Sequence, residues 1–462
     1  MKKIFVLLLT ISCLCVLFSQ EGNRSKTEQA RLDTLNYGTE NEVIELIKTL
    51  KSENDESMNE DLINLLNDTK NTTILIEVFT FFGGNEKSGL EERALELIEN
   101  RDDEASQSVT AAINYLGNVK SSDAVDLLID VIDSDEERYL GAAFQALGKS
   151  GGTNRRKAAD TAEYLIDYYE NNETTDNNRS EIIAALGELG VSTSLDFLIE
   201  MAENDNESVS RRMAAVKSLS KIGDSDGLDA IINCVSSSDP NLRSTAVSAL
   251  GPFSGRDAEN AIIEAFRDSF WRTRLAAAEA SSERKLKAAI PFLKFRAEKD
   301  EIPQVKDEAI KALGSIGTDE CFDILSTFFF DRKNSDRVRI ATGEVIISQR
   351  ADDYTEKFIV ELDEAKTKNL TVLYNGLSKI IATAETSKVS DLASRFLASG
   401  GVVERSYAMD MILKNGFSTL ADQIQPFVDE KKYGSLARKA RSTLEKMGIP
   451  VKEPETTENQ TK

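Results

Sequence analysis

Residues 305–317, VKDEAIKALGSIG, and their counterpart LRSTAVSALG at residues 242–251 decide the fold of this chain. Each is an amphipathic helical segment that closes with a small residue, a large apolar residue and, in most copies, a second small residue. This marker recurs at intervals of 31 to 39 residues, a period typical of stacked supersecondary units rather than of one closed core. Its central residues, apolar in all copies but one, are Leu116, Leu147, Leu186, Leu219, Leu250, Ser281, Leu313, Ile346, Ile380, Ile412 and Leu444.

One unit shows why each period is a pair of helices. Apolar residues recur at helical spacing over residues 205–223 and again over residues 225–236, which predicts two helices in succession. Gly223 can adopt the left-handed conformation that ends the first helix. Asp239 followed by Pro240 is a typical start of the next one. We therefore predict an all-α superhelix, a solenoid of roughly 11 to 13 helical hairpins in which each pair buries its apolar faces against its neighbours.

A second marker lies seven residues before the first. It is basic at seven of the eleven positions: Arg179, Arg212, Arg243, Arg274, Lys306, Arg339 and Arg405.

Together, these segments resemble HEAT repeats, specifically the short bacterial subtype also found in phycobilisome lyases. The likeness covers about residues 105–448, strongest over 179–346, and implies an α-solenoid fold without implying an activity. In repeats of this type the recurrent basic residue and nearby carboxylates form a ladder between units. The resemblance thus implies a structural ladder of Arg212, Arg243, Arg274 and Arg339 with Asp205, Asp239 and Asp336.

The repeat divides the chain into five regions. We predict a signal peptide at residues 1–19, a polar linker at 20–32, degenerate N-terminal capping repeats at 33–104, the HEAT-like solenoid at 105–448 and a disordered tail at 449–462. The longest interval, between Leu147 and Leu186, predicts a loop insertion at residues 171–178.

The first residues indicate export. A basic start, an apolar run over residues 4–18 and the small Ser19 are typical of a secretory signal, and the run is short for a membrane span. We expect cleavage after Ser19, a periplasmic or secreted protein, and no integral membrane span in the mature chain. The alternative is a lipoprotein acylated on Cys13.

Composition narrows the possible partners. The formal charge of −23 repels phosphate backbones, which argues against nucleic acid as a ligand. Outside the signal, Cys234 and Cys321 lie nearly three repeats apart in apolar helical stretches, so we expect buried free thiols, with an intermolecular disulfide as the alternative.

The sequence contains few of the residue types and motifs that enzymes use for catalysis. The chain has no histidine, which removes Ser-His-Asp and Cys-His machinery, and no phosphate-binding, cofactor or EF-hand motif. We therefore assign no catalytic, cofactor or metal site. Carboxylates are numerous enough that a carboxylate-based hydrolase or lyase in the solenoid groove stays an alternative, and it predicts a cluster of desolvated carboxylates with raised pKa values.

Some residues fit the repeat pattern poorly and are candidates for binding a partner. The only tryptophan follows Phe270 at a helix start, Phe329 is the middle of three consecutive aromatics, and the C-terminal end is basic. Alternatively, the aromatic residues fill the core and the basic residues are ordinary charges at a helix terminus. The candidates are Phe270, Trp271, Phe329, Lys431, Lys432 and Arg438.

These observations favour an exported, non-catalytic scaffold or adaptor for an unidentified protein partner. We expect the second helix of each hairpin to line the concave face and present a preformed surface. A third possibility is a structural envelope protein that self-associates, with its basic C-terminal end against the acidic remainder.

Overall fold

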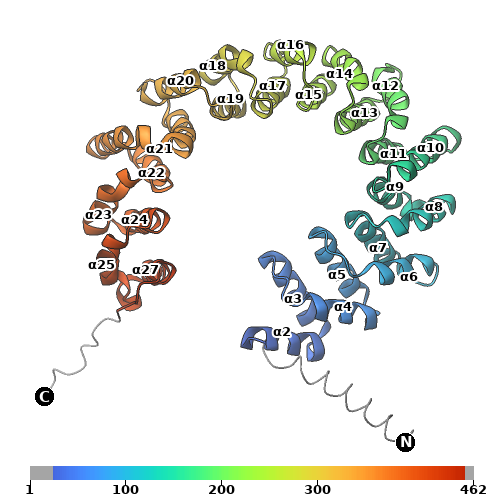
Figure 1. The fold of residues 1–462 in the computed structure, drawn as a ribbon, viewed down its shortest axis with the longest axis horizontal. Coiled ribbons are helices and arrows are strands. Elements are labelled where there is room, and N and C mark those ends of the chain that lie inside the picture. Colours follow the sequence, from blue (N-terminus) through green and yellow to red (C-terminus); the bar gives the residue numbers. More distant parts are fainter. Residues whose placement is uncertain (1–23, 453–462) are drawn as a thin grey trace, which may run out of the picture. The chain divides into compact units, whose positions relative to one another are not determined.

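A computed structural model of the chain describes residues 24–452. Within that range the regular structure consists of α-helices and short 3-10 helices, without a strand. It forms two compact units that divide between Cys234 and Val235, unit 1 before the division and unit 2 after it. Each unit is a stack of helical hairpins, as predicted (Figure 1). The predicted signal peptide, Cys13 and residues 453–462 lie outside the described residues.

Unit 1 has two layers. The first helices of its hairpins are α3 (Glu40–Glu53), α5 (Thr72–Gly84), α7 (Ser106–Asn118), α9 (Glu137–Gly151), α11 (Asp176–Leu189) and α13 (Val209–Ile222). The second helices are α4 (Asn59–Asp68), α6 (Glu91–Glu99), α8 (Val125–Asp133), α10 (Arg155–Asn171), α12 (Leu195–Glu203) and α14 (Leu228–Val235), and α2 (Lys26–Tyr37) precedes them all.

Unit 2 repeats the arrangement. Its first helices are α15 (Pro240–Ala249), α17 (Trp271–Glu283), α19 (Pro303–Ile316), the start of α21 (Asp336–Thr367), α22 (Thr371–Ala382), α24 (Val402–Asn415) and α27 (Ser435–Lys446). Its second helices are α16 (Arg256–Ala265), α18 (Ile290–Lys299), α20 (Asp319–Phe330), the rest of α21, α23 (Ser390–Ser399), α25 (Ala421–Ile424) and α26 (Glu430–Tyr433).

Many hairpins turn through a single 3-10 turn that runs straight into the second helix. These turns are η1 (Ser122–Ala124), η2 (Ser192–Ser194), η3 (Ser225–Gly227), η4 (Lys287–Ala289), η5 (Ser387–Val389) and η6 (Ser418–Leu420), and η7 (Gln425–Phe427) follows α25.

The predicted helix ends are confirmed. Gly223 and Gly317 follow their helices with φ of 69° and 71°, the left-handed region in which glycine carries no Cβ penalty. Asp239 accepts hydrogen bonds from the amides of Asn241 and Leu242, with Pro240 as the first helical residue. The local chemistry of these residues was therefore enough to place the boundaries.

The layers differ in how closely their helices pack. Within each unit, successive first helices pack against each other over much of their length, whereas second helices mainly contact first helices (Figure 1). In a curved stack of hairpins, the layer whose helices lie closer together is on the inner, concave side. Within each unit that layer is formed by the first helices (Figure 1). The prediction that second helices line the concave face is therefore wrong, because the small residues that permit close approach are on the first helices.

Two segments predicted as irregular are helical in part. α2 begins at Lys26, so most of the described part of the predicted linker 20–32 is helix, started by Ser25 in a capping box with Glu28. In the predicted loop insertion at 171–178, Asn171 ends α10 and residues 176–178 begin α11, and α10 is long, with 17 residues. The last turn of α10 is held by Tyr168, which packs edge-on against Phe144. Residues 172–175 alone separate α10 from α11.

The hairpin of α21 has no turn. Its two helices run into each other with a kink at Arg350, whose φ of −133° and ψ of 41° are not helical. At the other end of unit 2, the start of the predicted tail is packed, since Gln425 donates to the carbonyl of Pro450 and accepts from the amide of Lys452. Cys234 and Cys321 are buried free thiols, as expected.

Candidate functional site

The glycine of the marker joins neighbouring first helices in unit 1. A Cβ on Gly117 would lie 2.7 Å from the Cα of Ala146, and one on Gly148 would lie 2.7 Å from the Cα of Ala185. These distances are too short for any side chain, so glycine is required for the helices to meet backbone to backbone. Gly187 meets Ser218 in the same way.

This contact explains the repeated tripeptide. Ala146, Ala185 and Ser218 each precede the apolar residue of the next marker. In these copies the small residue therefore meets the marker glycine of the preceding repeat. The pattern extends into α5, where Phe82 and Gly83 occupy the marker positions and a Cβ on Gly83 would lie 3.6 Å from the Cα of Tyr115. Sequence reasoning missed this contact between first helices, although the small residues before Leu147, Leu186 and Leu219 were its signal.

The arginines of unit 2 form a ladder. Arg243 donates to the carboxylate of Asp268 at 2.7 and 3.0 Å and also to the carbonyls of Ser237 and Ser238. Arg274 binds Asp300 at 2.7 and 2.8 Å and also donates to the carbonyl of Asp268 at 3.0 Å. Asp268 thus accepts from two successive arginines. Each arginine connects the end of the preceding second helix to the end of the second helix in its own hairpin.

Arg339 continues the pattern within α20 and α21. It donates to the carbonyl of Phe329 at 2.8 Å and to the Glu361 carboxylate at 2.6 Å, and its side chain is 5% exposed. Burial at this level makes the pair costly to break, since an unpaired buried charge is strongly destabilising.

The predicted partners in the ladder are mostly wrong. Arg212 does pair with Asp205, at 2.6 Å, but Asp205 is 91% exposed. Asp239 caps α15 instead of binding Arg243, and Asp336 is the first residue of α21 while Arg339 binds Glu361. The prediction used carboxylates a few residues before each arginine. The structure uses carboxylates 22 to 26 residues after it, which the hairpin brings back beside the arginine.

The ladder shifts the pKa values of its carboxylates. The hydrogen bond from Arg243 lowers the pKa of Asp268 below its usual range, against the effect of burial. Burial alone would raise the pKa of Asp300, whose side chain is wholly buried, but Arg274 and the Ile302 amide lower it overall. Both carboxylates are therefore held in the charged form, which suits a structural pair better than a proton donor.

The aromatic candidates for partner binding have different surroundings. Phe270 and Trp271 are half-buried at the start of α17, and the exposed guanidinium of Arg272 lies 4.7 Å from the Trp271 ring centre. Phe329 is fully buried and stacks on Phe358 with ring centres 3.9 Å apart. Its selection as a binding residue is therefore wrong, because it belongs to the core beneath Arg339.

The basic candidates Lys431, Lys432 and Arg438 are exposed and lie on α26 and α27, which pack together. Asp429 accepts from the amides of Lys431 and Lys432, and the ammonium of Lys432 lies 5.1 Å from the Tyr433 ring centre. Sequence reasoning missed an apolar surface nearby along the chain: Leu370, Val372, Val402 and Val403 are 40 to 65% exposed at the starts of α22 and α24.

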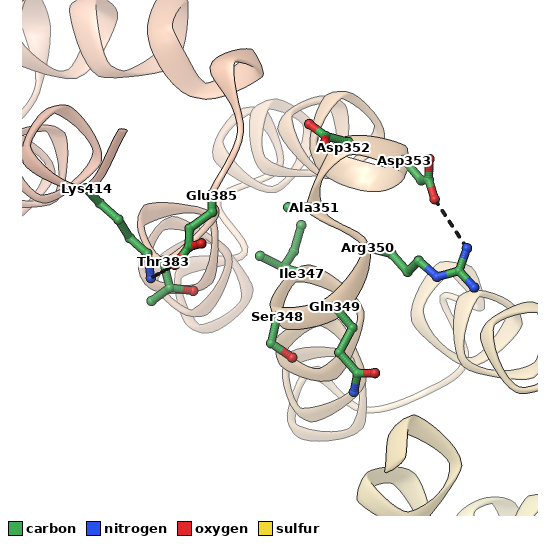
Figure 2. Close-up of a pocket in the computed structure, with 10 residues that line it drawn as sticks. All are labelled: Ile347, Ser348, Gln349, Arg350, Ala351, Asp352, Asp353, Thr383, Glu385 and Lys414. Atoms are coloured by element: carbon green, nitrogen blue, oxygen red, sulfur yellow. Dashed lines mark ion pairs between the residues drawn. The ribbon is translucent and has the colours of Figure 1, made fainter. Parts of the chain in front are cut away.

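A pocket of about 560 Å³ lies beside the kink of α21 in unit 2. Figure 2 shows its ten lining residues, with Arg350 turned toward Asp353 and Lys414 toward Glu385. Asp352 accepts a hydrogen bond from Thr386, and Arg350 also pairs with Asp319. Because these charged groups already neutralise one another, the pocket offers a ligand little unbalanced charge.

A larger groove, of about 640 Å³, crosses α5, α7 and α9 on the exposed side of the first-helix layer of unit 1. Its exposed lining includes Thr80, Asn114 and Gln145, above the buried rings of Phe79 and Tyr115. None of the thirteen described residues that line it is acidic. A smaller pocket of about 350 Å³ lies between α11 and α13 of the same layer.

The described residues give little support to carboxylate catalysis. Burial and the nearby Glu308 raise the pKa of Glu279, but Glu308 itself pairs with Lys311, and the described residues hold no group of three or more His, Cys, Asp or Glu suited to a metal. None of the helices described between residues 24 and 452 has the length and apolar character of a membrane span.

Hairpins stacked in two layers, with first helices joined at recurrent small residues, define the class of HEAT-repeat α-solenoids. A family profile described as "Spirochaete HEAT repeat protein" matches residues 35–443. The chain belongs to this family, and the match includes most of the region predicted as degenerate caps. No curated protein sequence matches the chain significantly.

Several solved structures are similar over long stretches. YibA of Escherichia coli shares 19% identity over 55% of this chain and 94% of its own, with a TM-score of 0.38. The karyopherin Kap121p, bound to the extreme C terminus of the protein phosphatase Cdc14p, shares 11% over 90% of this chain and 53% of its own, with a TM-score of 0.45. The CpcE–CpcF complex of phycocyanin lyase from Nostoc shares 15% over 63% and 94%, with a TM-score of 0.24.

Proposed function

We propose that the protein is an exported, non-catalytic scaffold that holds a protein partner on the first-helix layer of unit 1. The observation that carries this proposal is the groove across α5, α7 and α9, a preformed hollow on a layer of rigidly joined helices. A preformed surface binds with little ordering cost, which is how a rigid scaffold gains affinity. Export rests on the signal-like residues 1–19, and periplasmic or secreted localisation is part of the proposal.

The absence of catalysis is supported by chemistry. Without histidine, a proton shuttle at neutral pH would need a carboxylate with a raised pKa close to a second catalytic group. Glu279 has a raised pKa, but its acidic neighbour Glu308 is already paired with Lys311. A binding role uses the same first-helix layer without requiring such a group.

Site-specific photo-cross-linking in living cells tests the proposal. A benzophenone amino acid at Gln145, in the groove, is compared with one at Glu163, exposed on the second helix α10. We expect a specific protein to be captured through position 145 and not through 163. Capture of the same proteins from both positions, or of none from 145, contradicts the proposal, and links to a second copy of the chain would favour self-association instead.

A separate experiment tests the proposed localisation. Fractionation of the same cells, with protease added to intact and permeabilised cells, is expected to place the mature chain outside the cytoplasm. N-terminal sequencing of the mature chain distinguishes cleavage after Ser19 from lipidation at Cys13. A chain that retains Met1 and stays protected with cytoplasmic markers would contradict export.

A further inference from the structure

The groove of unit 1 carries a line of matched polar side chains. Thr80, Asn114 and Gln145 each lie two residues before the apolar residue of the marker in α5, α7 and α9, so they occupy the same place on three successive first helices. All three are exposed and line the groove. The stack of repeats therefore turns one helical position into a row that crosses the layer.

The spacing of this row suits an extended chain. Packed helices lie roughly 8–10 Å apart, whereas an extended peptide advances about 3.3 Å per residue. A peptide laid across the layer would therefore meet a new helix about every three residues. A carboxamide offers both a donor and an acceptor, as a peptide group does, so Asn114 and Gln145 can pair with backbone groups whatever the side chains are.

The charge of the groove is opposite to that of the chain. The protein has 79 acidic against 56 basic residues, yet the groove is lined by two cations, Arg138 and Lys149, and no carboxylate. Arg138 is already paired with Glu136 at 2.6 Å. Lys149 is half-buried and donates to the neutral Asn118 at 2.9 Å, and it forms no ion pair with any described residue.

We infer that this groove binds an extended peptide segment of the partner with an acidic side chain placed opposite Lys149. The inference rests on the proposed scaffold function and names the chemistry of what the scaffold holds. Carboxamides of the row take the peptide backbone, and the buried aromatic rings form the floor. The half-buried ammonium of Lys149 gains the counter-charge that residues 24–452 do not supply.

The test uses the purified mature chain and a displayed library of random dodecapeptides. We expect enrichment of peptides that contain Asp or Glu, with binding confirmed by fluorescence anisotropy of labelled synthetic copies. Lys149→Gln should weaken such a peptide by about tenfold, the loss of one hydrogen bond to a charged group. Lys157→Gln, an equal charge change at an exposed position of α10, should leave the affinity unchanged.

A charge exchange separates direct contact from a structural effect. Lys149→Glu should abolish binding of the acidic peptide, and replacement of its critical Glu by Lys should restore binding to that variant. Enriched peptides without acidic residues, or equal binding to wild type and Lys149→Gln, would overturn the inference. So would a library that yields no binder, and in each of these cases the cross-links from position 145 still decide separately whether the scaffold proposal holds.

Discussion

Neighbouring repeats of α7, α9 and α11 in unit 1 are joined differently from those of α15, α17 and α19 in unit 2. In unit 1, Gly117 and Gly148 let helix backbones meet, and in α7 and α9 the positions seven residues before the marker are the buried Val109 and Leu140. In unit 2 the equivalent positions are Arg243 and Arg274, bound to carboxylates of their own hairpins.

The marker glycines of unit 2 meet side chains rather than backbone. A Cβ on Gly251 would meet the carboxylate of Glu283, and one on Gly314 would meet the side chain of Val345. The same period can therefore be stabilised by close apolar packing or by buried ion pairs. Periodicity predicts the stack, but the kind of joint depends on which side chains meet across it.

Removal of one buried carboxylate should produce the largest effect. Asp300→Ala leaves the guanidinium of Arg274, 11% exposed, without its bidentate partner. We expect a loss of about 3–5 kcal/mol in the free energy of unfolding of unit 2. Urea unfolding followed by the fluorescence of Trp271, which begins the helix of Arg274, measures it. A loss below about 1 kcal/mol would show that the ladder is not a structural joint.

A methyl group placed where two helix backbones meet at a glycine should lower the free energy of unfolding by less than the loss of Asp300 does. Gly148→Ala places a methyl group against the backbone of Ala185, which cannot rotate away, so we expect a loss of about 1–3 kcal/mol. Gly314→Ala should cost less, because its methyl group meets the Val345 side chain rather than a helix backbone, and alanine favours the helix by up to about 1 kcal/mol.

Gly84→Ala, at a position with open space, is the control for helix propensity. Circular dichroism during urea unfolding measures all three variants. Equal losses of stability in Gly148→Ala and Gly314→Ala would contradict the distinction between a backbone contact at Gly148 and a side-chain contact at Gly314.

Low pH should weaken the ion pairs of the unit 2 ladder and so destabilise unit 2. The folded pKa values of Asp268 and Asp300 are lowered, so their contribution is fully present above the ordinary carboxyl pKa of about 3.9 and is lost as pH falls through the folded values. We expect Trp271 fluorescence to report a cooperative acid transition that is shallower in Asp300→Asn. A transition of equal steepness in the variant would show that Asp300 does not couple protonation to folding.

The exposed ion pair between Asp205 and Arg212 should contribute least to stability. Asp205→Ala removes the carboxylate paired with Arg212, but Asp205 is 91% exposed, and the guanidinium keeps the carbonyl of Ala202 at 2.9 Å. We expect a change of less than about 1 kcal/mol that disappears in high salt. Thermal unfolding at two salt concentrations measures it. A larger, salt-insensitive loss would place this pair among the structural joints.

Much of the fold could be predicted from the residues. The period, the helix ends at Gly223 and Gly317, the capping role of Asp239 and the buried cysteines all depend on local propensity and on burial pattern. The candidate site could not be predicted in the same way. The groove depends on Thr80, Asn114 and Gln145, which are ordinary surface residues until the stack aligns them.

The sequence by itself determined a stack of helical hairpins, because caps, glycines and apolar spacing act within a few residues of each other. Tertiary structure alone decided that Arg274 binds Asp300, that first helices form the inner layer, and that the α21 hairpin kinks at Arg350 without a turn. Each of these depends on which residues the folded hairpins bring together. Carboxylates some 25 residues from their arginines become neighbours only when the second helix returns to the layer of the first.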